Sequence, residues 1–341
     1  MKDEVAPLAS KGENDSPAAS SLACRILRRL ISLAQALSVV LICVTVATGF
    51  ARYHWCADLL ANLRVQQVLV LVGVLMLFLV SRQWKWCVVV GVMIAIHVPW
   101  FAAAFPVRSH VQRNASDLRI TLANVFTRND QHGKIADDIV RGNPQVIVIL
   151  ELSSSLAQKL SDELAESHPH RILYPDDAGN FGIGLFSAFA IKEYKLFDID
   201  ESIGIKSIEA AIGGYRVYAT HPLPPMSSRG FAARNRHLDK FASRIRDHQG
   251  RFPEQPIVLV GDLNVTPWSP FFADFEQRSG LKRAIDGIDF EPTWYAFDWF
   301  PFGLVLDHAM ISHGVRCIDQ CVGPNIGSDH RSVTVELSLA Q

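Results

Sequence analysis

The run Gly261-Asp262-Leu263-Asn264 carries side chains that can do chemistry, and it directly follows the apolar run 257–260. An apolar run rich in β-branched residues is typical of a strand buried on both faces. On an alternating strand, Asp262 and Asn264 would point the same way. They would then offer a proton acceptor and a neutral hydrogen-bonding group at the carboxyl end of a strand, where α/β proteins place their sites. Asp and Asn are also common turn residues, so this run alone leaves both interpretations open.

Polar side chains of complementary chemistry stand next to five further apolar strands. They are Asn124, Glu151, His221, Asp307 with His308, and Asp329 with His330. Glutamate and amide oxygens hold Mg²⁺, an ion that polarises a phosphoryl oxygen. Histidine and aspartate supply an acid, a base and orientation for attack by water, and asparagine offers a dipole to a developing oxyanion. Together these residues predict metal-dependent hydrolysis of a phosphate ester.

The elements that must position these residues alternate between strand and helix from about residue 118 onward. Expected strands cover 119–124, 146–150, 182–186, 188–195, 205–212, 215–220, 257–260, 305–312 and 333–337. Expected helices cover 134–141, 153–166, 231–248 and 270–278. Gly213-Gly214 predicts a tight hairpin turn between two of the strands. Hairpin-like and crossover-like connections both occur, so we expect an α/β domain with a mixed sheet, or a pair of sheets, flanked by helices.

The sequence before this domain is strongly apolar, in a chain of 341 residues with net charge −1 and 49% hydrophobic residues. Residues 1–24 are rich in Ser, Ala, Gly, Pro and charge, so we expect a disordered tail. Apolar stretches follow at about 30–50, 65–80 and 87–105. Their lengths predict transmembrane helices, although the second needs its polar start or a tilt to reach across a bilayer. The alternative is a set of buried core helices.

Lysine and arginine near the spans indicate their orientation. One side of the membrane would carry Arg25, Arg28, Arg29, Arg82 and Lys85. The other side would carry Arg52 and Arg64, together with Arg108, Arg113 and Arg119 after the third span. The bias is modest and favours an N-terminus inside the cell, so three spans place everything after about residue 107 outside. We therefore expect a multi-pass protein of the bacterial inner (cell) membrane with a periplasmic or extracytoplasmic domain.

The polar motifs, in this order, resemble the endonuclease/exonuclease/phosphatase superfamily with its DNase I-like fold. The resemblance extends from about residue 118 to 337. Its pieces are Asn124, Leu150-Glu151, Thr220-His221, Gly261-Asp262-Leu263-Asn264, Thr293-Trp294, Leu306-Asp307-His308 and Ser328-Asp329-His330. It implies a four-layer α/β sandwich of two mixed β-sheets flanked by helices. The chain then divides into a tail (1–24), a membrane region with about three transmembrane helices (25–106) and a catalytic domain (107–341). This layout resembles a membrane-anchored bacterial subgroup that includes the teicoplanin-resistance membrane protein.

The resemblance implies a Mg²⁺ site, in which Mn²⁺ can substitute. Glu151 would be the principal metal ligand, with Asn124 beside it and Asp329 near the metal. Two positions depart from the family pattern: Ala123 stands where an aromatic residue is usual, and Leu150 where Gln is common. These departures concern the detail of the metal site rather than the class of chemistry.

The resemblance also implies catalytic roles. Asp262 would position or activate the attacking water, and Asn264 would hold the scissile phosphate. His330 would contact the phosphate, oriented by Asp307. His221 would be the second acid–base group, and because abasic-site endonucleases typically have Tyr at this strand end, it argues against abasic-site repair.

Two further features bear on the substrate. Arg234 begins the buried face of the helix expected at 231–248, so it either turns into the cleft toward a phosphate or packs by its stem with its head in solvent. Further basic residues lie in or next to this helix: Arg229, Arg236, Lys240, Arg244 and Arg246. They would contact a nucleic-acid backbone or anionic lipid, or would only face solvent.

Trp294 opens an aromatic segment that continues with Tyr295, Phe297, Trp299, Phe300 and Phe302. This segment could bind a lipid tail, enter the membrane interface, stack on bases or be core.

We expect membrane lipids and a phosphate-containing substrate as partners, and we infer no protein partner. A lipid-linked phosphate such as a polyprenyl diphosphate is the leading expectation, because a membrane anchor holds the site near lipid. The rival is a membrane-tethered endonuclease or exonuclease acting on DNA or RNA. An alternative of another class is a catalytically dead, membrane-tethered binding module, against which the full set of polar residues argues.

Cys317 and Cys321 are the cysteines of the expected catalytic domain. On a straight strand their α-carbons would be roughly 13 Å apart, too far for a disulfide. They would pair only in an exported domain whose chain turns between them.

Overall fold

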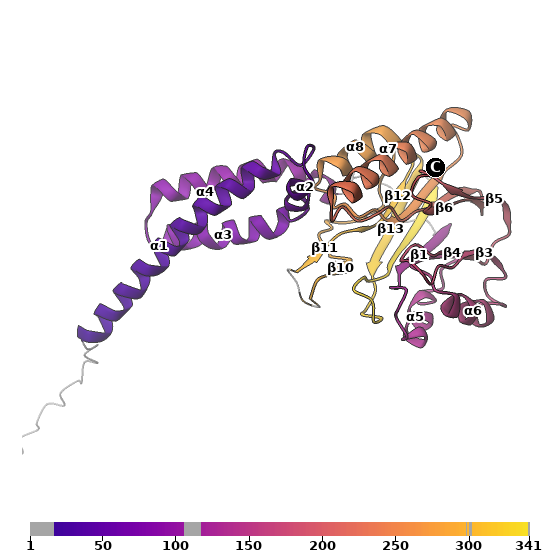
Figure 1. Cartoon of the computed structure of the whole chain (residues 1–341), viewed down its shortest axis with the longest axis horizontal. Coiled ribbons are helices and arrows are strands. Elements are labelled where there is room, and N and C mark those ends of the chain that lie inside the picture. Colours follow the sequence, from indigo (N-terminus) through magenta and orange to yellow (C-terminus); the bar gives the residue numbers. More distant parts are fainter. Residues whose placement is uncertain (1–16, 106–116, 298, 300–301, 340–341) are drawn as a thin grey trace, which may run out of the picture.

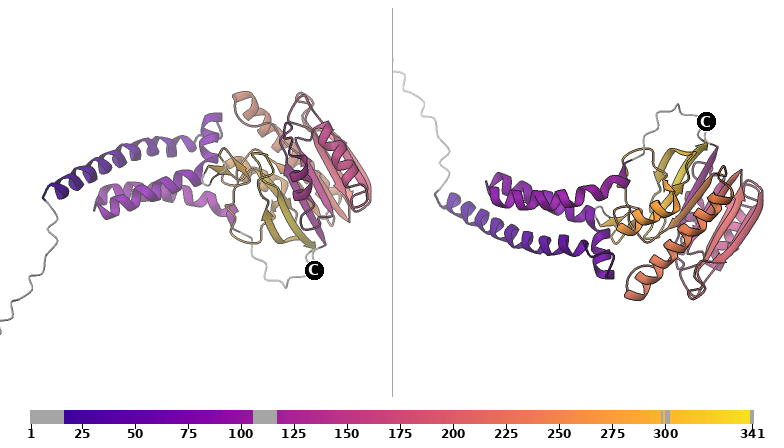
Figure 2. Two further views of the ribbon diagram at one scale, coloured as in Figure 1. Left: turned by 90° about the horizontal axis from the view of Figure 1, so that it is seen from below. Right: turned by 90° about the horizontal axis from the view of Figure 1, so that it is seen from above.

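Three long helices at the N-terminal end of the chain lie side by side, at one end of a domain built from sheets (Figure 1). The structure is a computed structural model and describes residues 17–105, 117–297, 299 and 302–339. The helical region comprises α1 (Pro17–Thr48), α2 (Trp55–Asn62), α3 (Arg64–Val80), α4 (Trp84–His97) and the short 3₁₀ helix η1 (Val98–Ala104). The chain runs toward the sheet domain in α1, away from it in α3 and back in α4 (Figures 1 and 2).

Two of these helical segments are long and apolar enough to cross a membrane, Cys24–Thr48 and Trp84–Ala104. They correspond to the first and third expected spans. The second expected span, 65–80, matches α3, which qualifies only together with α2, across a bend of 62°. Only 22% of each of the two long segments is buried, and large apolar side chains such as Leu33 and Val80 are exposed. The alternative of buried core helices is therefore wrong, because a core helix would hide these side chains.

Helix α1 begins at Pro17, so residues 17–24, expected to be disordered, are helical instead. Proline suits the first turn of a helix because its fixed φ is already helical and its missing N–H would have had no partner there. The Ala-rich segment that follows has a high helix propensity, and the adjoining apolar span extends the same helix. The remaining expected tail, residues 1–16, lies outside the described residues.

The second part of the chain forms two six-stranded sheets and a small hairpin. The first sheet has the order β13-β14-β1-β2-β4-β3, with bounds Val315–Val322, Val333–Leu339, Leu118–Asn124, Val146–Leu150, Ile183–Ser187 and His170–Tyr174. The second has the order β5-β6-β7-β8-β12-β9, with bounds Ile191–Asp198, Lys206–Ile212, Tyr215–Ala219, Ile257–Asp262, Asp307–Ile311 and Lys282–Arg283. Strands β10 (Trp294–Tyr295) and β11 (Gly303–Leu304) pair with each other. Both large sheets are mixed, as expected.

The two sheets pack face to face, with helices on their outer faces (Figures 1 and 2). Alternation along β2 explains this layering: Val146 and Val148 face the core between the sheets, while Ile147 and Ile149 face the helices. The outer helices are α5 (His132–Ile139) and α6 (Ser154–Glu163) on the first sheet, and α7 (Ser228–Arg251) and α8 (Pro270–Ser279) on the second. The predicted four-layer α/β sandwich is confirmed.

Five strands escaped prediction: the two-residue strands β9, β10 and β11, and the longer strands β3 and β13, which are both edge strands. In β3 only Ile172 is buried, so its residues lack an apolar run. In β13, polar residues alternate with apolar ones and a bulge lies between Cys317 and Asp319. Cys317 and Cys321 lie along this one strand and are free thiols. The Gly213-Gly214 turn is confirmed: it joins β6 to β7, and both glycines have positive φ, as a two-residue hairpin turn requires.

Candidate active site

The carboxyl ends of the central parallel strands meet at one edge of the sandwich. Strand β1 runs parallel to β2 in one sheet and β7 runs parallel to β8 in the other. Gly261 allows β8 to approach β7, because a Cβ at that position would lie 2.2 Å from the carbonyl oxygen of Thr220. The polar residues that end these strands therefore meet across the two sheets. Six of them are buried: Asn124, Glu151, His221, Asp262, Asp307 and His330.

Asp262 is the hub of this cluster. Its Oδ2 accepts a hydrogen bond from Asn124 Nδ2 at 3.3 Å and lies 3.4 Å from His221 Nε2 and 3.6 Å from His330 Nε2. Burial alone would raise the pKa of Asp262, but the two histidines outweigh burial and lower it to about 2. Asp262 is therefore ionised throughout the neutral range.

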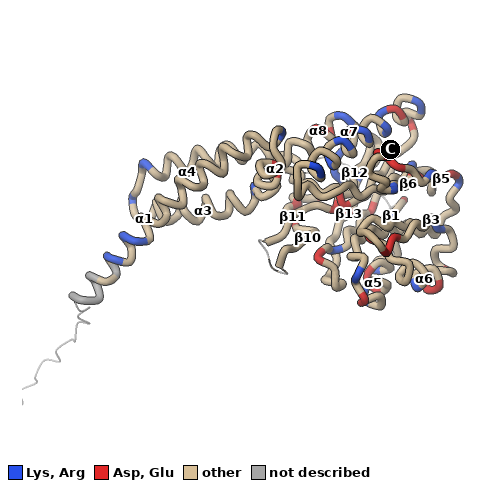
Figure 3. The backbone as a smooth tube through the Cα atoms, in the orientation of Figure 1, with Lys and Arg blue, Asp and Glu red and all other residues tan. Residues whose placement is uncertain are grey.

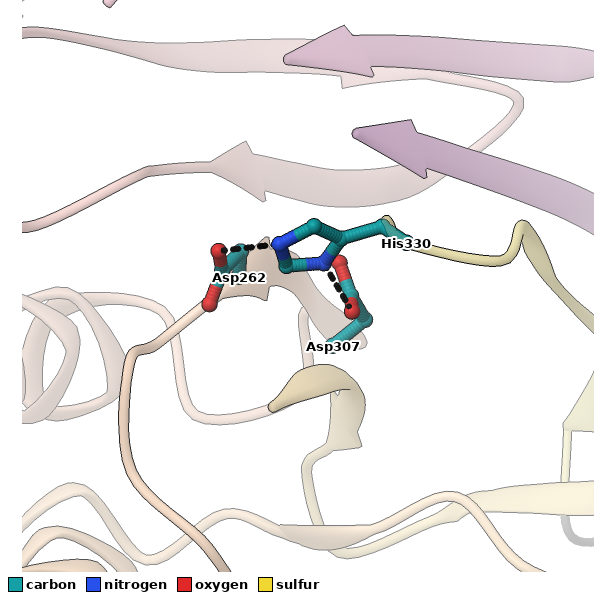
Figure 4. A group of neighbouring side chains, drawn as sticks. All are labelled: Asp262, Asp307 and His330. Atoms are coloured by element: carbon teal, nitrogen blue, oxygen red, sulfur yellow. Dashed lines mark hydrogen bonds and ion pairs between the residues drawn. The ribbon is translucent and has the colours of Figure 1, made fainter. Parts of the chain in front are cut away.

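His330 lies between two carboxylates (Figure 4). Its Nδ1 donates to Asp307 Oδ2 at 2.8 Å, and its Nε2 faces Asp262. The main-chain N–H of Asp307 donates to Thr293 Oγ1 at 2.9 Å, which anchors the start of β12. Burial would lower the pKa of His330, but Asp307 and Asp262 together raise it to about 10. The ring is accordingly an imidazolium at neutral pH, able to donate a hydrogen bond to an anionic oxygen.

His221 approaches the same oxygen of Asp262 as His330 does. Burial lowers its pKa, while the hydrogen bond and charge of Asp262 raise it, and the net shift is upward. Its ring centroid is 5.3 Å from that of Phe181. Among the described residues, its Nδ1 has no hydrogen-bond partner. The structure thus brings His221 and His330 to one carboxylate, an arrangement that can provide two protonated groups to a phosphate ester.

Glu151 and Asn124 form the oxygen-rich part of the cluster. Asn124 Nδ2 donates to Glu151 Oε1 at 3.1 Å, and the main-chain N–H of Thr127 donates to Oε2 at 3.4 Å. Glu151 has a φ of 58°, a backbone region that few residues other than glycine adopt and that often marks functional sites. Burial raises the pKa of its carboxyl group. A bound cation would reverse that shift, because it favours the carboxylate.

Two overlapping sets of donors suit a metal ion. The ligand atoms of Asp262, Asp307 and His330 lie within 4.8 Å of one another. In that set, however, His330 Nδ1 is already committed to Asp307. Glu151 and Asp262 offer the hard carboxylate oxygens that Mg²⁺ prefers, and Asn124 Nδ2 donates a hydrogen bond to one oxygen of each. The two carboxylates therefore fit the expected cation, with Asn124 beside them.

Asn264 does not follow the expected alternation with Asp262. Strand β8 ends at Asp262, and Asn264 has a φ of 51°, so the chain turns there. The N–H of Asn264 donates to Asp262 Oδ1 at 2.9 Å, and its Nδ2 donates to the Pro222 carbonyl at 3.1 Å. The turn interpretation of this run is thus correct, and the turn joins Asn264 to the Asp262 carboxylate. The catalytic roles expected of the two residues stay predictions.

Asp329 and Trp294 form the rim of the cluster. Asp329 is exposed and accepts a hydrogen bond from Trp294 Nε1 at 2.8 Å. The backbone of Trp294 pairs with that of His330 in an isolated bridge. The structure therefore joins Asp329 to the aromatic segment beside His330, and Trp294, half-buried, borders the site as a substrate-contacting residue would.

Arg234 is not on a cleft wall. Its side chain is fully buried, and its Nη2 donates to Asp58 Oδ2 in α2 at 2.5 Å. Neither expected placement is correct, since the guanidinium reaches neither a cleft nor solvent. Sequence reasoning missed Asp58, although it is the only acidic residue between positions 17 and 105. It also missed the Thr127 N–H that holds Glu151, because a main-chain donor leaves no residue-type signal.

Comparisons with known proteins agree with this geometry. A family model described as the endonuclease/exonuclease/phosphatase family matches residues 122–330. The fold is similar to that of the 3′ phosphatase NExo from Neisseria bound to a product DNA hairpin, at 19% identity and a TM-score of 0.54, covering 65% of this chain and 99% of that one. It is also similar to truncated Caenorhabditis elegans TDP2, at 14% identity and a TM-score of 0.52, covering 65% and 97%. No curated protein matches the chain. Because the family model spans more than half of the sequence and contains the whole cluster, the chain belongs to the endonuclease/exonuclease/phosphatase family, whose members hydrolyse phosphoester bonds.

Proposed function

We propose that this chain is a membrane-anchored, Mg²⁺-dependent phosphoesterase that hydrolyses a lipid-linked phosphate with water. The observation that carries the proposal is the β10–β11 hairpin, which joins the catalytic cluster to the helical region. At one end, Trp294 contacts Asp329 and pairs with His330. On the other strand, next to the partner of Trp294, the carbonyl of Gly303 accepts a hydrogen bond from Gln66 Nε2, in the first turn of α3, at 2.7 Å. A lipid headgroup at the helices is thus adjacent to the rim of the site.

The hairpin presents apolar surface. Phe297 and Trp299 are 68% and 67% exposed, and Phe302 is also exposed; Phe300 lies outside the described residues. Exposed clustered aromatic residues beside membrane helices are typical of the bilayer interface. This exposure rules out the core interpretation for these three residues. The contact between Gly303 of the same hairpin and Gln66 of α3 favours lipid over nucleobases as the contacting partner.

The basic α7 offers less support for a nuclease. Most of its basic side chains are engaged within the chain. Arg236 and Lys240 contact Asp200, Arg244 contacts Glu209, and Arg246 donates to the carbonyls of Arg278 and Gln277. The two carboxylates offset part of the positive charge, so the helix presents a weaker positive field to a nucleic-acid backbone than its composition indicates.

The arrangement of charge supports an outward-facing domain. Basic residues of the helical region gather at the end remote from the sheets (Figure 3), namely Arg25, Arg28, Arg29, Arg82 and Lys85. The two arginines near the sheets are engaged with that domain: Arg52 pairs with Asp274, and Arg64 donates to the carbonyl of Trp268. The basic side chains that are remote from the sheets therefore lie on one side, which favours that side as cytoplasmic in a bacterial inner membrane.

The residues divide the chemistry among them. Glu151 and Asn124, with Asp262, would hold Mg²⁺, which polarises a phosphoryl oxygen. The carboxylate of Asp262 orients the attacking water, and the His330 imidazolium donates to the developing negative charge on the phosphate. His221, with its raised pKa, protonates the leaving oxygen.

The test is phosphate release from liposomes carrying a polyprenyl diphosphate, run beside a plasmid-nicking assay with Mg²⁺. We expect lipid turnover that falls by roughly 100-fold or more in His330→Ala and Glu151→Ala. Nicking without lipid turnover would replace the lipid substrate with nucleic acid. Phosphoesterase activity unchanged in both variants would instead refute the catalytic roles of these residues, and a wild type without phosphoesterase activity would make the domain a binding module. A periplasm-dependent reporter fused after residue 341 tests the orientation, and a cytoplasmic signal contradicts it.

A further inference from the structure

The short helix α2 is docked on the sheet domain rather than exposed at the end of the bundle (Figure 1). Its polar side chains are buried: Asp58 is 0% exposed and Asn62 is 4% exposed. A carboxylate is very costly to bury unless it is paired, and it would be equally costly in hydrocarbon. The partners that stabilise Asp58 and Asn62 lie in the catalytic domain, so α2 belongs structurally to that domain.

One chain of contacts leads from α2 to the catalytic loop. Asp58 Oδ2 accepts from Arg234 Nη2 at 2.5 Å, and the other terminal nitrogen, Nη1, donates to the carbonyl of Asn264 at 2.9 Å. The planar guanidinium makes both bonds at once, which a lysine ammonium on its flexible stem does not reproduce. Asp58 thereby fixes the orientation of the group that holds Asn264.

A second set of contacts holds the residues that follow Asn264. Asn62 Oδ1 accepts from both the main-chain N–H of Thr266, at 2.7 Å, and its hydroxyl, at 2.9 Å. The indole of Trp268 donates to the carbonyl of Asn62 at 3.0 Å. The loop 264–268, which leads away from Asp262, is thus held by α2 along its length.

The loop needs such support because of its backbone. Asn264 has a φ of 51°, and a residue in this region keeps that conformation only when its surroundings hold it there. Asp262 and Pro222 hold its N–H and side chain, and Arg234 holds its carbonyl. We propose that α2 is a positioning element of the active site, with Asp58 acting through Arg234 on Asn264. This inference rests on the proposed function for its kinetic consequence alone.

The experiment compares three variants of the full-length chain in detergent. Asp58→Asn removes the charge that holds Arg234. Arg234→Lys keeps a charge beside Asp58 but leaves the Asn264 carbonyl without its donor, so it tests the link even where Asp58→Asn folds poorly. Arg52→Gln is the matched control, because it breaks the junction ion pair with Asp274 but makes no contact with the loop. Amide hydrogen exchange of the segment 261–266 is the first readout, and Mg²⁺-dependent hydrolysis of bis(p-nitrophenyl) phosphate is the second.

We expect exchange in this segment to quicken about tenfold in Asp58→Asn and Arg234→Lys and to stay unchanged in Arg52→Gln. We expect kcat to fall about 10- to 100-fold in the first two variants with KM within about threefold, as for a displaced catalytic group. Wild-type exchange and kcat in folded Arg234→Lys would overturn the link. Equal effects in all three variants would also overturn it, because the junction as a whole would then be responsible. A wild type that hydrolyses no phosphate ester contradicts the proposed function. The exchange data still decide whether Asp58 acts through Arg234 on Asn264.

Discussion

Replacing Asp307 by Asn tests whether the buried carboxylate sets the protonation of His330. The carboxylate accepts the Nδ1 proton of His330 at 2.8 Å, and both residues are buried. The amide keeps the shape of the side chain and a hydrogen-bond acceptor but removes the charge. Two charges about 4 Å apart interact by about 4 kcal/mol at an effective dielectric constant near 20. That energy corresponds to about 3 pKa units.

The pKa of His330, about 10 in the native site, should therefore fall to about 7 in Asp307→Asn. The native imidazolium persists to high pH, so deprotonation of His330 should not lower the wild-type rate below about pH 9. In the variant, the protonated fraction should decrease about tenfold per pH unit above about 7. At pH 8.5 the variant should then retain only about one thirtieth of the activity it has at pH 6.

The assay is the pH dependence of kcat/KM for bis(p-nitrophenyl) phosphate at saturating Mg²⁺. Asp162→Asn, which neutralises an exposed carboxylate of α6, is the control for net charge. Thermal unfolding at pH 6 establishes that Asp307→Asn is folded, since losing one partner of a buried ion pair can cost about 3–5 kcal/mol. An alkaline limb that coincides with that of wild type, in a folded variant, would refute the assignment of Asp307 as the group that keeps His330 charged.

Other residues give further predictions. Glu151→Gln should raise the Mg²⁺ concentration for half-maximal activity about 10- to 100-fold, measured by metal titration, and chelation with EDTA should abolish wild-type turnover until Mg²⁺ is restored. The pKa of Asp262 is lowered in the folded state, so its contribution is present above its unfolded pKa and is lost as the pH falls through about 2. The destabilisation caused by Asp262→Asn, about 2 kcal/mol at pH 7, should thus shrink between pH 4 and 2 in thermal melts. Trp299→Ser should reduce turnover of liposome-borne substrate about tenfold and leave soluble bis(p-nitrophenyl) phosphate hydrolysis unchanged, since only the former needs the interface; equal losses on both substrates would contradict the lipid contact.

Much of the fold was predictable because buried central strands carry their signal in consecutive residues. The runs 146–150 and 257–260 are apolar on both faces, and a polar residue marks the end of each. Periodicity also located α5, α6, α7 and α8 to within a few residues. The edge strands β3 and β13 were missed, because a strand paired on one side needs no continuous apolar run.

The types of side chain in the site were predictable, whereas their contacts were not. Sequence spacing indicated that Glu151, His221, Asp262 and His330 each stand at a strand end. It did not indicate that Asp262 would be the carboxylate shared by both histidines, because that depends on the separation of two sheets. The left-handed backbone of Asn264 is likewise a consequence of surrounding contacts rather than of residue type alone.

Arg234 illustrates what only the tertiary structure decided. Its position on the buried face of α7 was readable from helical periodicity, but its partner, Asp58, lies 176 positions earlier in a segment that composition assigns to the membrane region. The sequence by itself determined which types of side chain the site would contain, where the apolar spans lie, and in which order polar residues follow the strands along the chain. These are all local patterns of residue type. Packing alone decided that α2, in the predicted membrane region, and α7 share a buried ion pair, because burying Asp58 is favourable only where a distant arginine neutralises it.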